Sequence, residues 1–208
     1  MDNKYKLTDE TIEFNGVKLY RIEALKDFSL VKKGDKGGFV QSERNLSHDG
    51  DCWIFVDSKV LEESSVSGNA TYVYGNSVIM GYARILGDSL VKDSTINGFS
   101  KVWGQSLIEN SRISGDSRIC GNAEICDALI ESSSDYIVFK NWWSSLRHFT
   151  WTRSNNMWKV GCFYGTGEEL IEKAYRDSEL SGREYKRVVE YVESILRDEI
   201  QNKEIINL

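Results

Sequence analysis

A short pattern repeats from Ser58 to Glu131, and it limits the possible folds more than any other feature of the chain. Each repeat has a small residue, an aliphatic residue two positions later and, in most repeats, Gly, Asp or Asn two positions after that. The aliphatic residues are Val60, Val66, Val73, Ile79, Ile85, Val91, Ile96, Val102, Ile108, Ile113, Ile119, Ile125 and Ile130. Such short units bury an apolar side chain only by stacking on their neighbours, so the pattern predicts a solenoid.

From Val73 onward, three repeats make one larger unit of 17 residues. Three short strands in each coil predict a triangular cross-section. The shortest step falls at the same corner of every coil, and this corner carries Asp93, Asn110 and Asp127. Asn and Asp tolerate the left-handed backbone best among residues other than Gly, so turn geometry explains these residues without a bound cation.

The hexamers Ala83-Arg-Ile-Leu-Gly-Asp88 and Ser117-Arg-Ile-Cys-Gly-Asn122 resemble those of hexapeptide-repeat proteins with a left-handed parallel β-helix. The resemblance implies the left-handed winding, which the spacing alone does not show. The 17-residue coil departs from the family pattern, in which a coil is a multiple of six residues. Acyltransferases, carbonic anhydrases and non-catalytic assembly proteins all use this scaffold, so the resemblance implies a fold and no single activity.

The sequence predicts three parts: an N-terminal hairpin cap at 1–38, the solenoid at 39–134 and a small α+β unit at 135–208. Asn15-Gly16 between two alternating segments is a strong hairpin signal, and an open solenoid end needs a cap over its strand edges. In the last part we expect strands at 136–139, 149–152 and 157–163. Capping boxes at Thr166 and Ser181 predict two helices, Glu168–Asp177 and one from Ser181 to about Glu199.

A second resemblance covers nearly the whole chain. It rests on Leu19-Tyr-Arg-Ile22, the turn Gly34-Asp-Lys-Gly-Gly-Phe39, Asn45-Leu-Ser47 and Gly161-Cys-Phe-Tyr-Gly-Thr166. These segments resemble hexapeptide-repeat proteins of bacteriophages and prophages of gut bacteria, which carry no established activity. The resemblance implies a phage origin.

Charge and cysteine usage restrict the location and the partners. The net charge is −6, and residues 39–134 hold 13 acidic and 7 basic residues, so direct binding to nucleic acid is not expected. The N-terminal sequence lacks the apolar core of a signal peptide, and no run is long enough to span a membrane. The four cysteines show no CxxC pair, which favours reduced thiols in the cytoplasm of a bacterial host cell.

Arg84, Lys101 and Arg118 are spaced 17 residues apart and should form a column of cations, with Trp103 on the same face. This column could hold a phosphate or an acidic partner, with Trp103 as an anchor. Alternatively, acidic neighbours or a packed subunit compensate the charges. On another face, Leu90 and Leu107 predict a homo-oligomer, a dimer or a trimer.

A second candidate binding cluster comprises Arg147, Trp151 and Arg153, which strand alternation places on one face together with Phe149. Aromatic side chains interleaved with cations can stack a base and hold phosphate. The alternative is that these aromatic residues form the core of a small domain.

No catalytic residue, cofactor or metal site is predicted. Hexapeptide acyltransferases use a histidine as general base, but His48 precedes the regular coils and His148 follows them. We expect His48 to be a turn residue held by Asp49 or Asp51.

The combined hypothesis is a mainly β protein, a left-handed parallel β-helix of about five coils, that acts as a non-enzymatic phage or prophage binding protein. It would inhibit a host protein, with a counter-defence role, or sequester a small anionic ligand. The alternatives are a hexapeptide-type acyltransferase-like enzyme on a small substrate and a structural phage component.

Overall fold

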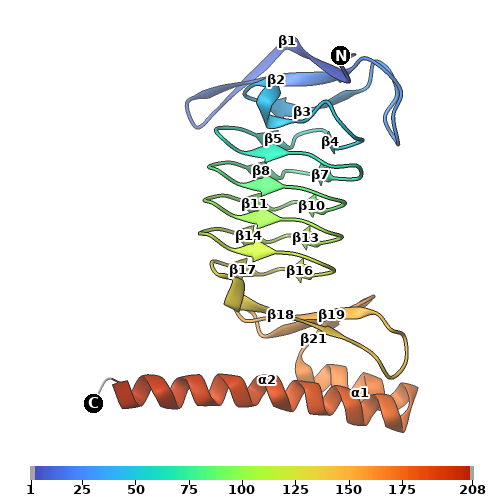
Figure 1. The fold of residues 1–208 in the computed structure, drawn as a ribbon, viewed down its shortest axis with the longest axis vertical. Coiled ribbons are helices and arrows are strands. Elements are labelled where there is room, and N and C mark those ends of the chain that lie inside the picture. Colours follow the sequence, from blue (N-terminus) through green and yellow to red (C-terminus); the bar gives the residue numbers. More distant parts are fainter. Residues whose placement is uncertain (1–2, 207–208) are drawn as a thin grey trace. The chain divides into compact units, whose positions relative to one another are not determined.

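The computed structural model describes residues 3–206 and contains two compact units. The first unit comprises Met1–Val138 with Thr152–Asn155, and the second comprises Phe139–Trp151 with Asn156–Leu208. The first unit contains a parallel β-solenoid of about five turns, as predicted (Figure 1).

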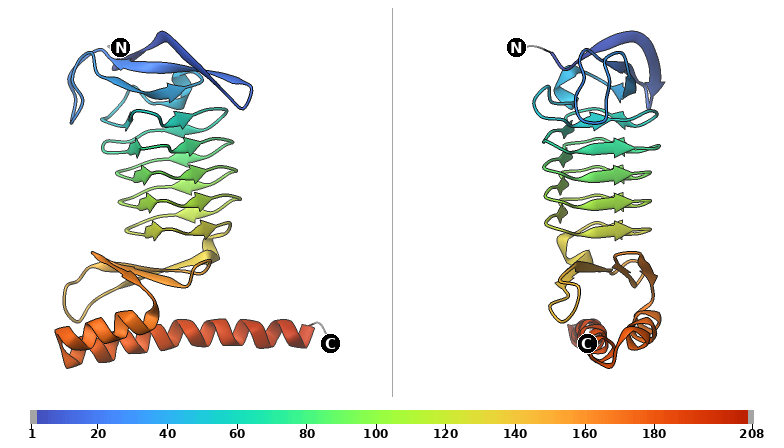
Figure 2. Two further views of the ribbon diagram at one scale, coloured as in Figure 1. Left: turned by 180° about the vertical axis from the view of Figure 1, so that it is seen from behind. Right: turned by 90° about the vertical axis from the view of Figure 1, so that its right-hand side faces the viewer.

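The solenoid has three sheets, one for each side of the coil. The first sheet contains, in order, β1 (Tyr5–Phe14), β2 (Val17–Ala24), β3 (Lys36–Val40), β5 (Lys59–Val60), β8 (Val78–Ile79), β11 (Thr95–Ile96), β14 (Arg112–Ile113) and β17 (Leu129–Ile130). The second contains β4 (Trp53–Ile54), β7 (Tyr72–Tyr74), β10 (Leu90–Lys92), β13 (Leu107–Glu109) and β16 (Glu124–Cys126). The third contains β6 (Ser65–Val66), β9 (Arg84–Ile85), β12 (Lys101–Val102) and β15 (Arg118–Ile119). Within the solenoid, equivalent strands of successive coils stack on one another (Figure 2).

The 17-residue period is confirmed by the strand register. Ile96 of β11 lies opposite Ile79 of β8 and Ile113 of β14, and Ile113 lies opposite Ile130 of β17. All four side chains are fully buried. Because each aliphatic side chain packs between its counterparts in the neighbouring coils, the core is continuous along the solenoid.

The small residue of each repeat lies inside the coil beside the turn. The side chains of Ser89 and Ser106 are buried, and each hydroxyl donates to the carbonyl oxygen three residues earlier, at 2.8 Å to Leu86 and 2.9 Å to Trp103. A hydroxyl at this position therefore finds a hydrogen-bond partner inside the coil and also satisfies the carbonyl oxygen that accepts from it.

The corner residues have the predicted backbone conformation. Asp93, Asn110 and Asp127 have φ values of 47°, 50° and 51°, in the left-handed region. The Asn110 side-chain amide donates to the Asp127 carboxylate of the next coil, and Asp93 Oδ1 accepts from the Asn76 backbone N–H at 3.0 Å. These side chains therefore link consecutive corners.

The N-terminal hairpin is present. β1 and β2 pair antiparallel around Asn15 and Gly16, whose φ values of 51° and 76° match a type I′ turn. β2 then pairs antiparallel with β3, and β3 pairs parallel with β5 of the solenoid. The hairpin thus extends the first sheet; its role as a cap stays a prediction.

The C-terminal part has one more strand than predicted. β18 (Tyr136–Lys140), β19 (His148–Thr152), β20 (Met157–Val160) and β21 (Phe163–Gly165) form one sheet in this order. The predicted strand at 157–163 is a hairpin, because Gly161 has a φ of 57° and turns the chain between β20 and β21.

Two helices follow, α1 (Gly167–Asp177) and α2 (Glu179–Ile206). The Thr166 capping box is confirmed, with Thr166 Oγ1 accepting from the Glu169 backbone N–H at 3.3 Å. The predicted start at Ser181 is wrong, because Ser178 Oγ accepts from the Ser181 N–H at 3.1 Å and α2 already begins at Glu179. Neither α1 nor α2 has, within 3–206, an apolar stretch sufficient to cross a membrane.

Candidate anion-binding face

The predicted column of cations is present on the third sheet. Lys101 lies opposite Arg84 in β9 and opposite Arg118 in β15. Each cation is the first residue of a two-residue strand, and the second residue is fully buried. Alternation along the strand therefore points all three cations to solvent, at the roughly 4.8 Å spacing of neighbouring strands. We call these three residues the basic ladder.

An aromatic pair lies beside the basic ladder. The rings of Tyr82 and Phe99 are parallel within 6°, with centroids 4.8 Å apart, and remain 55% and 66% exposed. Coil-to-coil hydrogen bonds hold both residues in place, from the Tyr82 N–H to the Gly98 carbonyl at 2.8 Å and from the Phe99 N–H to the Gly115 carbonyl at 2.7 Å. Asp116 occupies the same position in the next coil.

The basic ladder and the column formed by Tyr82, Phe99 and Asp116 line one surface hollow of about 380 Å³. Its lining residues are Tyr82, Arg84, Phe99, Lys101, Asp116 and Arg118. Within residues 3–206, no oppositely charged group lies within 4.0 Å of a ladder cation. On the second sheet, by contrast, Lys92 pairs with Glu109 of the next coil at 2.7 Å. The three cations thus have no salt-bridge partner among the described residues, although Asp116 lines the same hollow.

Trp103 lies next to the ladder in sequence but does not line the hollow. Its backbone N–H donates to the Ile119 carbonyl at 3.0 Å, and its side chain is half-buried. Tyr82 and Phe99 supply the aromatic surface instead. Sequence reasoning missed this pair, although the 17-residue register of positions 82, 99 and 116 would have revealed the column.

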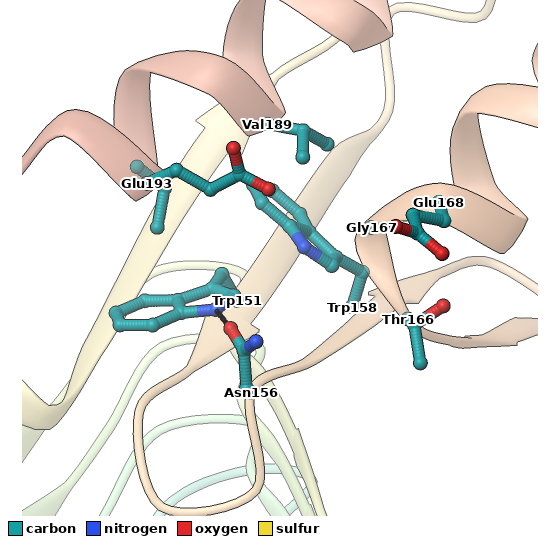
Figure 3. Close-up of a pocket in the computed structure, with 9 residues that line it drawn as sticks. Trp151, Asn156, Trp158, Thr166, Gly167, Glu168, Val189 and Glu193 are labelled. Atoms are coloured by element: carbon teal, nitrogen blue, oxygen red, sulfur yellow. Dashed lines mark hydrogen bonds between the residues drawn. The ribbon is translucent and has the colours of Figure 1, made fainter. Parts of the chain in front are cut away.

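The second predicted cluster is not brought together. Trp151 is only 1% exposed, and its indole N–H donates to Asn156 Oδ1 at 2.8 Å (Figure 3). Arg147 is exposed and lines a different hollow with Cys162 and Lys173. Arg153 belongs to the first unit, where its Nε lies 3.9 Å from the Asp135 carboxylate. The burial of Trp151 and Phe149 favours the core interpretation of the aromatic residues.

A smaller hollow of about 230 Å³ lies beside the Trp151 and Trp158 rings in the second unit (Figure 3). Part of its lining comes from Thr166 and Glu168 at the start of α1 and from Val189 and Glu193 of α2. Two carboxylates and two indoles make a poor site for an anion, which distinguishes this hollow from the one at the basic ladder.

Neither histidine lines the hollow at the basic ladder. The His48 ring stacks on Tyr5 with centroids 4.3 Å apart, and its Nδ1 accepts from the Lys4 backbone N–H at 3.2 Å. His48 is therefore held by Tyr5 and the Lys4 N–H, and not by Asp49 or Asp51 as expected. His148 begins β19. Nowhere in the described part of the chain do three His, Cys, Asp or Glu side chains group to hold a metal ion.

Comparison with known proteins gives one informative similarity. No family model matches the chain. The Uncharacterized acetyltransferase YdcK of Escherichia coli (strain K12) is 31% identical over 86 residues, which cover 38% of this chain. The match covers 26% of YdcK, so the chain spans about a quarter of that relative.

This similarity corrects one prediction. The chain was expected to be non-enzymatic, but the relative that it matches is named as an acetyltransferase, and this contradicts that expectation. The similarity does not bear on a phage origin or on inhibition of a host protein. Together, the parallel β-solenoid and the acetyltransferase-like relative fit a β-helix family of the hexapeptide-repeat type.

Proposed function

We propose that this protein is an acyltransferase-like enzyme that binds a phosphate-bearing acyl donor, of the acyl-coenzyme A class, on the basic ladder. The observation that carries the proposal is the set of three in-register cations in the hollow beside Tyr82 and Phe99, none of which has a carboxylate within 4.0 Å in residues 3–206. The acetyltransferase-like relative supports the choice of donor.

The charge of the hollow suits a ligand with several phosphates. Arg84 and Arg118 can each hold a phosphate through two parallel N–H donors, and Lys101 between them contributes a compact point charge. Since Arg84 and Arg118 are two strand spacings apart, about 10 Å, a ligand with two separated phosphate groups can contact more than one cation of the basic ladder.

The aromatic pair suits the heterocyclic base of the same ligand. Tyr82 and Phe99 already stack on each other and are held by backbone hydrogen bonds, so little freedom is lost when a base adds to their exposed surface. Stacking of a base on an aromatic side chain contributes about 1–3 kcal/mol. A base and its phosphates would therefore bind side by side in one hollow.

Asp116 is the candidate proton acceptor, since it is the carboxylate among the lining residues and neither histidine lies there. In the proposed reaction the acceptor nucleophile attacks the thioester carbonyl, the carbon–sulfur bond breaks, and Asp116 takes the proton from the nucleophile. Asp116 then passes this proton to the leaving sulfur, so the coenzyme leaves as its thiol.

The test measures thiol release from acetyl-coenzyme A in the presence of a panel of small amines and alcohols. We expect turnover in the wild type, loss of turnover with binding retained in Asp116→Asn, and loss of both in Lys101→Glu. Arg112→Glu is the matched control, because Arg112 is also the exposed first residue of a two-residue strand but lies on the first sheet. Equal turnover in wild type and Lys101→Glu would contradict the proposal.

A further inference from the structure

Lys4 and Cys52 form a buried amine–thiol contact that the proposed function does not use. The Lys4 side chain is 1% exposed and Cys52 is fully buried. The distance from Lys4 Nζ to Cys52 Sγ is 3.3 Å, across 48 positions of sequence. No carboxylate of residues 3–206 lies within 4.0 Å of the Lys4 amine, and such a buried lysine is rare in proteins and calls for an explanation.

The Lys4 amine is fixed in this position. Its Nζ donates to the carbonyl oxygens of Gly50 at 3.0 Å and Cys52 at 2.9 Å, and it lies 5.2 Å from the centre of the Phe28 ring. The next residue, Tyr5, is anchored through its hydroxyl to the Leu46 carbonyl at 2.8 Å. The amine is therefore held against the sulfur with little freedom to move away.

Among residues 3–206, the Lys4 amine is the nucleophilic neighbour of the sulfur. Apart from the amine, the polar atoms around Cys52 Sγ are the carbonyl oxygens of Ser47, Asp49 and Val66, at 3.6, 3.7 and 3.9 Å. Burial lowers the pKa of the Lys4 amine and raises the pKa of the Cys52 thiol. Both shifts favour the neutral pair, in which the amine carries its free electron pair.

We propose that Lys4 and Cys52 are a redox-sensitive modification site, at which hydrogen peroxide produces a covalent sulfur–nitrogen bond. The neutral Lys4 amine takes the Cys52 thiol proton as the sulfur attacks peroxide, and the leaving hydroxide then takes that proton, which gives sulfenic acid, one water and the free amine. The Lys4 nitrogen then attacks the sulfenic sulfur. The sulfur–oxygen bond breaks, and the leaving oxygen departs as a second water with a proton from the amine.

The two steps balance. Thiol, amine and one peroxide give one sulfenamide and two waters, so the sulfur loses two electrons and the peroxide gains them. Sulfenic acids condense in this way with a nearby nitrogen. The short contact favours this condensation over further oxidation, because the amine is already in place when the sulfenic acid forms.

The bond would tie the start of β1 to the first coil of the solenoid. Closing a loop between residues 4 and 52 restricts the unfolded chain, as a disulfide does. We therefore expect oxidation to raise the midpoint of thermal unfolding and to protect the N-terminal strand from proteolysis. A thiol reductant restores both groups.

The test treats the intact protein with a graded series of hydrogen peroxide and analyses it by mass spectrometry. We expect a species that has lost two hydrogen atoms, a linked peptide pair joining Lys4 to Cys52, and its loss on addition of dithiothreitol. The exposed Cys162 is the internal control for oxidant delivery. Lys4→Arg keeps a long basic side chain but lacks a nucleophilic amine, so it should give no linked pair.

Three outcomes would overturn the proposal. The first is oxidation of Cys162 with Cys52 recovered as free thiol or as sulfinic acid. The second is loss of two hydrogen atoms that persists in Cys52→Ala. The third is a linked pair that retains one oxygen atom, which would exclude the direct sulfur–nitrogen bond. The first and third outcomes are read from the wild type, so they do not depend on the folding of either variant.

Discussion

Lys101 lies directly opposite Arg84 on the neighbouring coil, and no acidic group lies within 4.0 Å of either side chain in the described part of the chain. Like charges at opposite strand positions destabilise a sheet. The basic ladder therefore lowers the stability of the fold when no ligand is bound, and a bound anion would relieve the repulsion.

Neutralising Lys101, the middle residue of the basic ladder, should raise the stability of the fold and weaken anion binding. Lys101→Gln removes the repulsion on both sides and should raise the free energy of unfolding by about 0.2–1 kcal/mol. The same variant should bind anions more weakly. Urea denaturation at low salt measures the first effect, and the gain should shrink at high salt because salt screens exposed charges. A variant less stable than wild type would show that Lys101 has a stabilising partner.

Two glycines at one corner offer a test of the stacking. Gly104 and Gly121 have φ values of 83° and 68°, so alanine is strained at both positions, by about 1–2 kcal/mol. A Cβ on Gly104 would lie 2.8 Å from the Gly121 carbonyl oxygen, whereas a Cβ on Gly121 would have no atom within 4 Å. Gly104→Ala should therefore lose more stability than Gly121→Ala. Equal losses, measured by chemical denaturation, would argue against the close approach of these corners.

The core column should be sensitive to lost volume. Ile96 is fully buried between Ile79 and Ile113. Ile96→Ala should lower the free energy of unfolding by about 2–5 kcal/mol, whereas Ile96→Val should cost about 0.5–1.5 kcal/mol. Hydrogen exchange should show lost protection in the coils next to Ile96. A loss confined to the far end of the chain would contradict the continuous core.

The hairpin carries a pH-dependent interaction. Hydrogen bonds from Lys36 at 2.9 Å and Arg21 at 2.6 Å hold the pKa of Glu10 below its usual range. A carboxyl group with a lowered pKa in the folded state stabilises fully above its unfolded pKa, about 4.3, and loses this contribution as pH falls through the folded value. NMR titration should show the low pKa, and Glu10→Gln should weaken the loss of stability on acidification. A Glu10 pKa at its usual value in the folded protein would contradict this prediction.

The sequence predicted the solenoid because its period is set by local rules. An aliphatic side chain must face inward at every strand, and the corner positions 93, 110 and 127 need residues that accept positive φ. The same register placed Arg84, Lys101 and Arg118 in one column. These features depend on neighbours one coil apart, which the sequence shows directly.

The remaining features depend on packing that has no period. Alternation could place Trp151 on one face of β19 but could not show that Phe149, Thr150, Trp151 and Thr152 are all buried, on both faces of the strand. The start of α2 was misplaced because Ser181 and Glu184 form an apparent capping box inside the helix, where Ser178 caps instead. Gly182 lies there because α1 passes close: a Cβ on it would approach the Tyr175 ring to 2.3 Å.

The most direct measurement is the binding of coenzyme A to wild type, Lys101→Glu and Arg112→Glu by calorimetry at low ionic strength. We expect binding in wild type and Arg112→Glu, a loss of at least about tenfold in Lys101→Glu, which corresponds to about 1.4 kcal/mol, and weaker binding as salt is added. Absence of binding in the wild type, or equal affinity in all three proteins, would contradict the assignment of the basic ladder as the donor site.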